Sequence, residues 1–243
     1  MKPNTRLTKA FIGGMAFAAM AGAAYAGRAS HTLHPGNALA LLALAAATSR
    51  MKIKLPGING NMSVNLPFLL MAVVSLSALE AIAIACISTV LQCWPQVKAK
   101  FKPEQMLFNA SMMAFATSTA NLIWNAGWLR KGAPASGSLM LASATAAFFL
   151  GQTAPVAGII RLAEGAPIRR VWVRIVQLSF PYYAVSAGIT SMTNLVSHLW
   201  GWQAALVVFP VMYGIHQSYR LYFSRAEQLP RSTPLVRAAS AGA

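Results

Sequence analysis

Acidic residues are nearly absent from this sequence. Its 243 residues include only four Asp and Glu, all of them glutamate, against 20 Lys and Arg, so the formal net charge is +16. Only 10% of the chain is charged and 56% is hydrophobic, whereas soluble domains carry about 25% charged residues. So few charges cannot cover a water-facing surface. We therefore interpret the basic excess as cytoplasmic loops that face anionic lipid, and we expect no nucleic-acid partner.

Cysteines and catalytic motifs are also scarce. Cys86 and Cys93 lie seven apart in an apolar run without a CxxC or zinc-type spacing, so we expect two reduced core thiols. His31 and His34 have no acid or cysteine nearby to complete a metal shell. The sequence contains no HExxH, no GxSxG and no carboxylate pair. We therefore predict no metal, no cofactor and no enzyme activity of its own.

Apolar runs recur along the whole chain and predict an all-α fold, a polytopic integral membrane helical bundle. The eight segments are 10–26, 35–49, 64–78, 79–95, 105–125, 136–160, 173–197 and 201–220. The third and fourth could form one long tilted helix, but basic clusters flank the pair on both sides. An even number of crossings keeps both clusters inside, which favours two spans that turn near Ser77 to Glu80.

Eight spans place both termini in the cytoplasm and leave only Arg28, Arg130 and Lys131 outside. We expect a membrane-embedded domain over 1–225 and a flexible cytoplasmic tail over 226–243. The first segment has two interpretations. It ends in "AYAG", as a cleaved signal peptide would, yet its small residues also suit a retained, closely packed helix, which we favour; these are Gly14, Ala18, Gly22 and Ala26.

The stretch "KIKLPGINGNMSVN" over 52–65 interrupts the apolar pattern. Its Pro-Gly and Asn-Gly pairs at 56–57 and 59–60 predict an irregular cytoplasmic loop. Ser63 or Asn65 could cap the helix that follows.

Five motifs together resemble a known family. They are "LPGINGNMSVN", "KPEQMLFNASMMA", "TAPVAGIIRLAEGAPIRRVW", "FPYYAVSAGI" and "GWQAALVVFPVMYGIHQSYRLYFSR". The order and spacing resemble the N-terminal polytopic membrane input region of bacterial diguanylate cyclase (GGDEF) and HD-GYP phosphodiesterase proteins. This resemblance implies signal sensing in a bacterial inner membrane, associated with cyclic-di-GMP. The sequence departs from the family after residue 225, where Pro230 and Pro234 disfavour a continued helix and no output motif follows.

Polar residues inside the predicted spans are candidates for ligand binding. Asn109, Thr117 and Asn121 form a stripe on one helical face, which predicts either interhelical hydrogen bonds or a pocket wall. Proline interrupts two other spans, next to candidate side chains; these are Gln152 and Thr153 in the sixth segment, and Tyr182 and Tyr183 in the seventh. Glu80, at the turn, either favours a helix dipole or senses a cation or proton.

Arginines cluster around the connection between the sixth and seventh segments; they are Arg161, Arg169, Arg170 and Arg174. They fit topology determination with anionic lipid, or else a docking surface for a partner. The leading hypothesis is a sensory, ligand-binding membrane module that acts through a separate protein partner or a homo-oligomer. The alternatives are a small-substrate transporter or transporter subunit, and a structural subunit of a larger membrane complex.

Overall fold

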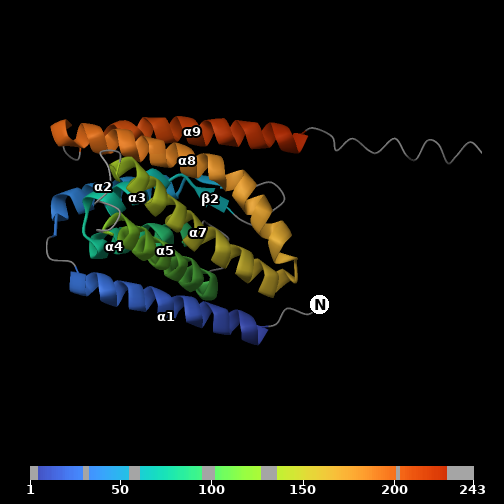
Figure 1. Cartoon of the computed structure of the whole chain (residues 1–243). Helices are drawn as coiled ribbons and strands as arrows, with labels where there is room; N and C mark the ends of the chain where they lie inside the picture. Colours follow the sequence, from blue (N-terminus) through green and yellow to red (C-terminus); the bar gives the residue numbers. More distant parts are fainter. Residues whose placement is uncertain are drawn as a thin grey trace, which may run out of the picture.

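The computed structural model describes residues 5–29, 33–54, 61–94, 102–126, 136–200 and 203–228. This part of the chain forms eight helices and one two-stranded antiparallel sheet (Figure 1). The elements are α1 (Thr5–Ala29), α2 (Pro35–Ser49), β1 (Lys52–Lys54), β2 (Asn61–Ser63), α3 (Leu66–Ser75), α4 (Ala78–Cys93), α5 (Pro103–Trp124), α7 (Ser136–Glu164), α8 (Ile168–Trp200) and α9 (Ala204–Gln228).

Each of the eight apolar segments coincides with one helix, so the predicted helical bundle is confirmed. The third and fourth segments are two helices and not one, because the chain leaves the helical conformation at Leu76 and Ser77. Helix α9 continues to Gln228, past the expected boundary at 225. Residues 229–243, with Pro230 and Pro234, lie outside the described residues, as do His31 and residues 55–60.

The expected irregular loop over 52–65 instead contains a hairpin. Strand β1 pairs antiparallel with β2, with Ile53 opposite Met62. The Lys-Ile-Lys alternation explains β1, since a strand turns successive side chains to opposite faces and Ile53 is buried. Asn65 occupies the position before α3, but its side chain makes no capping bond.

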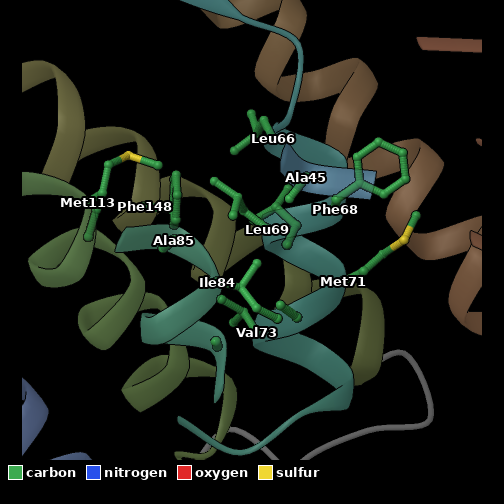
Figure 2. Packing of buried hydrophobic residues seen from close by; sticks show 14 of the residues in the cluster. Ala45, Leu66, Phe68, Leu69, Met71, Val73, Ile84, Ala85, Met113 and Phe148 are labelled. Carbon is green, nitrogen blue, oxygen red and sulfur yellow. The ribbon is translucent and has the colours of Figure 1, made fainter. Parts of the chain in front are cut away.

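Helix α3 is the buried centre of the bundle. All residues from Leu66 to Val73 are buried, and α3 packs against α2, α4, α5 and α8. Figure 2 shows side chains of α3 meeting Ala45 of α2, Ile84 of α4 and Phe148 of α7 in one cluster. With ten residues α3 is about 15 Å long, half of a bilayer core of about 30 Å.

Helix α5 is held between α1 and α7 by close contacts at small residues. A Cβ added to Gly22 of α1 would lie 2.7 Å from Ser118 Oγ of α5, and one added to Gly151 of α7 would lie 3.0 Å from Ala116 Cα. Phe11 and Phe108 also bring their rings within 6.2 Å. Helix α1 thus packs against α5 through small residues and one aromatic contact.

The bundle has an apolar exterior and small polar groups inside. Every described helix except α3 exposes large apolar side chains; Phe17 and Met192, for example, are 71% and 72% exposed. The buried polar residues are hydroxyls and amides without a charge, and they are Thr48, Ser49, Ser63, Asn65, Ser88, Thr89, Ser111, Thr117, Ser118, Asn121, Thr145, Thr153, Ser179, Ser186 and Thr190. Such an arrangement suits a lipid environment. By length and composition two described helices could cross a membrane, over 6–28 and 137–164.

The helix ends gather at two sides of the molecule. Helix α1 begins and α9 ends on the right in Figure 1, whereas α2 and α9 begin on the left. Lys9 and Glu104 form an ion pair of 3.3 Å between the starts of α1 and α5. At the other side, the backbone N–H of His34 donates to Glu80 Oε1 at 2.7 Å and joins the starts of α2 and α4.

Candidate ligand-binding site

A pocket of about 150 Å³ lies where four helices meet at one end of the bundle. It sits near the starts of α2 and α9 and the ends of α3 and α8. Its lining residues are Asn37 and Leu41 of α2; Met71, Val74 and Ser75 of α3; Thr190, Thr193, Asn194 and Ser197 of α8; and Ala205 of α9. We call it the end pocket. Among the described residues that line it, none is charged.

The hydroxyl groups of the end pocket already donate their hydrogens to backbone carbonyls. Ser75 Oγ donates to Met71 O at 2.6 Å, and Thr193 Oγ1 donates to Ile189 O at 2.8 Å. Thr190 and Ser197 make similar bonds to Ser186 O and Asn194 O, at 2.9 and 2.7 Å. These oxygens keep lone pairs that can accept further hydrogen bonds.

Two carboxamides complete the polar lining. Within the described part of the chain, the side chains of Asn37 and Asn194 have no hydrogen-bond partner. Asn37 is exposed and Asn194 half-buried. Each amide offers two N–H donors and one acceptor oxygen, so these groups can form new bonds to a ligand without breaking bonds within the protein.

The residues predicted from sequence do not line this pocket. Three helices bring some of them together elsewhere. Tyr183 of α8 donates from its hydroxyl to Gln152 Oε1 of α7, and Gln152 Nε2 in turn donates to the Met113 sulfur of α5. The Phe149 ring packs edge-on against Tyr183 at 4.8 Å. This chain of contacts joins the three helices, and a ligand role for Gln152 and Tyr183 stays a prediction.

The polar stripe on α5 mainly joins helices. Asn109 Nδ2 donates to Cys93 Sγ at 3.3 Å, and Asn121 Nδ2 donates to Val73 O at 3.3 Å. The Thr117 hydroxyl is buried, and none of the described residues bonds to it. The first two contacts are the interhelical bonds of one sequence interpretation. A ligand role for the stripe stays a prediction.

Tyr182 and Thr153 also make bonds between helices. The Tyr182 hydroxyl accepts from Leu66 N at 3.1 Å and satisfies the first N–H of α3. Thr153 Oγ1 donates to Phe149 O at 2.8 Å and accepts from Trp172 Nε1 at 3.4 Å. The backbone N–H of Leu66 is thus paired with a side chain 116 residues away.

Glu80 stabilises two helix starts. Its carboxylate accepts from Ser77 N at 3.0 Å and Ser77 Oγ at 2.7 Å in a capping box, and from His34 N. Partial burial acts to raise the pKa of Glu80. The hydrogen bonds from Ser77 and His34, together with the nearby imidazole, outweigh this effect and lower the pKa below its usual value.

The predicted arginine group lies at the opposite end of the bundle from the pocket. Arg161 is in the last turn of α7 and Arg169, Arg170 and Arg174 are in the first two turns of α8. All four are exposed. Gly165, with φ of 71°, ends α7 between them and turns the chain into α8.

No protein-family model, curated protein or solved structure matches the chain. The resemblance to membrane input regions is therefore carried by the sequence motifs alone.

A sequence signal for the end pocket does exist. Thr190, Thr193, Asn194 and Ser197 recur at the spacing of one helical face near the end of the seventh segment. Many other stripes in the sequence carry hydroxyl groups at the same spacing. Only the packing of α8 against α3 and α9 shows which stripe borders an open space.

Proposed function

We propose that this chain is a sensory, ligand-binding module of a bacterial inner membrane, without catalysis of its own, that acts through a separate protein partner. One observation carries the proposal. Helix α8 lines the end pocket with its last turns and carries three arginines in its first turns. With 33 residues it is about 50 Å long, enough to cross a bilayer core and reach both surfaces.

The contacts between α3 and α8 give a route from ligand to helix movement. Thr190 Oγ1 of α8 donates to Pro67 O of α3 at 3.3 Å. The hydroxyl of Tyr182, also on α8, accepts from Leu66 N at the start of α3. A ligand in the end pocket lies between these two helices. Binding that favours one spacing of α3 and α8 shifts the population toward it and moves the arginine-bearing end.

The proposed topology has eight spans with both termini in the cytoplasm. The basic residues near the starts of α1 and α8 lie at the side where α9 ends (Figure 1), which agrees with the positive-inside rule. The end pocket then opens toward the outer face. The short helix α3 crosses only part of the bilayer in this topology. The helices around it bury its side chains, so α3 is held by contacts with protein and does not need to span the lipid.

The proposed partners follow from the exposed arginines at the end of the bundle opposite the end pocket. Four exposed arginines near the membrane surface attract anionic lipid headgroups and acidic protein surfaces. Together with the motif resemblance, this supports a role as the input part of a cyclic-di-GMP system whose output domain is a separate protein.

Native mass spectrometry of the protein, gently extracted from its own membrane, tests the proposal. We expect a discrete small molecule to remain bound to the wild type and to Asn109→Leu, and to be lost from Asn194→Leu. Replacing Arg169, Arg170 and Arg174 with Gln should remove the protein partner and leave the small molecule bound. A stoichiometric partner without any small molecule would instead support a structural subunit.

The transporter alternative also has an observation in its favour. Helices α7, α8 and α9 each contain an internal proline, at Pro155, Pro181 and Pro210. Proline removes a backbone hydrogen bond and permits bending. Accumulation of the extracted small molecule inside proteoliposomes that contain only this protein would decide for transport.

A further inference from the structure

We infer that the end pocket binds a small uncharged molecule that carries several hydrogen-bond donors, such as a short polyol. This inference rests on the proposed function of the pocket and names the chemical class of its ligand. It follows from the size of the pocket, from its lack of charge and from the balance of its hydrogen-bonding groups.

The size of the pocket restricts the ligand first. A volume of about 150 Å³ is the size of an engineered cavity that accepts benzene. Pockets for drug-sized molecules are larger, about 300–1,000 Å³. The part of a ligand that the pocket encloses therefore has roughly six to ten non-hydrogen atoms, the size range of benzene and slightly larger molecules.

The absence of charge among the described lining residues restricts the ligand further. None of the described lining residues is acidic or basic, and an ion that leaves water without an opposite charge pays a large desolvation penalty. A carboxylate ligand would find no lysine or arginine among these residues, and an ammonium ligand would find no carboxylate. An uncharged molecule avoids both losses.

The hydrogen-bonding groups of the lining then favour a ligand that carries donors over one that carries only acceptors. The hydroxyls of Ser75, Thr190, Thr193 and Ser197 donate to backbone carbonyls, so toward a ligand they act as acceptors. The amides of Asn37 and Asn194 add two more acceptor oxygens and are the only donors on these six side chains. A ligand with several O–H groups matches this excess of acceptors and can still accept from the two amides.

The apolar part of the lining suits the carbon skeleton of such a molecule. Leu41, Met71, Val74 and Ala205 surround the polar groups. A short polyol has a hydrocarbon backbone that packs against these side chains, while its hydroxyls reach the amides and the hydroxyl oxygens.

Three probes of nearly the same shape test the charge requirement. They are glycerol, which is uncharged, 3-aminopropane-1,2-diol, which is a cation, and glycerate, which is an anion. Binding to the full chain in glycerol-free detergent micelles is measured by saturation-transfer NMR. We expect glycerol to bind about tenfold or more tightly than either charged analogue, and we expect Asn194→Leu and Asn37→Leu to lose that binding. Gln177→Leu, which replaces an exposed carboxamide of α8 outside the pocket lining, is the matched control and should bind like the wild type.

Each result decides the inference. If a charged analogue binds more tightly than glycerol and this binding depends on Asn194, the pocket is a ligand site but its ligand class is wrong. If no probe shows binding that depends on Asn194 or Asn37, the ligand class is also overturned, while a small molecule found by native mass spectrometry would leave the sensory function standing. Asn37 is exposed, so its substitution tests the inference even where Asn194→Leu impairs folding.

Discussion

At the scale of single residues, the asparagines of this molecule divide into two groups. Asn109 and Asn121 use their amides for bonds between helices. Asn37 and Asn194 border the end pocket, and no described residue bonds to their amides. In a lipid environment a buried amide without a partner is costly. The first group should therefore matter for stability and the second for binding.

Asn121→Leu should destabilise the bundle by about 1–2 kcal/mol, because Val73 O near the end of α3 loses its side-chain donor. Asn109→Leu should cost about 0.5 kcal/mol or less, since a cysteine sulfur is a weak acceptor. Thermal unfolding in one detergent measures both. Equal losses for the two variants would contradict this assignment.

Glu80→Gln should remove a pH-dependent part of the stability. The pKa of Glu80 is lowered in the folded protein, so its contribution is present above the usual carboxyl pKa and is lost as the pH falls through the folded value. The variant should be less stable than the wild type by about 1 kcal/mol at pH 7. The difference should shrink on acidification, as measured by unfolding midpoints across pH 3–7. A difference that stays constant with pH would argue against a role for the ionised carboxylate.

At the scale of elements, small residues determine how closely α5 approaches its neighbours. Gly22 and Gly151 face α5 from two sides without side chains of their own. In membranes, close helix approach supplies packing that the hydrophobic effect does not provide. The positions of α1 and α7 therefore depend on two glycines and on the short side chains Ala116 and Ser118.

Gly151→Ala should destabilise the protein by about 1–3 kcal/mol, because the new Cβ would lie 3.0 Å from the backbone of α5 at Ala116. Gly188→Ala in α8 is the matched control, since a Cβ there meets nothing within 4 Å. It should be neutral or slightly stabilising. Thermal unfolding compares the two, and a neutral Gly151→Ala would show that α5 and α7 separate readily.

At the scale of the whole molecule, the proposed function depends on which ends of the helices share a side of the membrane. The ion pair of Lys9 with Glu104 and the bond of His34 to Glu80 place helix starts together at opposite ends. The end pocket lies near the second group and the arginines near the first. This polarity is what a module that senses on one side and reports on the other requires.

Cysteine labelling distinguishes the eight-span topology from a topology in which only α1 and α7 cross the membrane. In a background with Cys86 and Cys93 replaced by Ala, Asn37→Cys should react with an impermeant maleimide in intact cells. Arg50→Cys should react only after the cells are opened, because α2 crosses the bilayer in the eight-span topology. If only α1 and α7 crossed, Arg50→Cys would react from outside as well.

The sequence by itself determined the helical class, the number of helices described and most of their positions. Apolar runs, prolines and basic clusters are local signals, and they also separated α3 from α4 at Ser77. The sequence did not predict two features. One is the hairpin of β1 and β2, where a short alternation lies beside strong turn signals. The other is the bond from Leu66 N of α3 to the Tyr182 hydroxyl, which joins residues 116 apart in the chain.

Only the tertiary structure decided which polar stripe faces its neighbours and which faces an open space. Asn121 and Asn194 are the same residue type in similar helical surroundings, yet one bonds to Val73 O and the other borders the end pocket. A pocket is the volume that four packed helices leave unfilled. That volume depends on distances between α2, α3, α8 and α9, which no spacing within one helix contains.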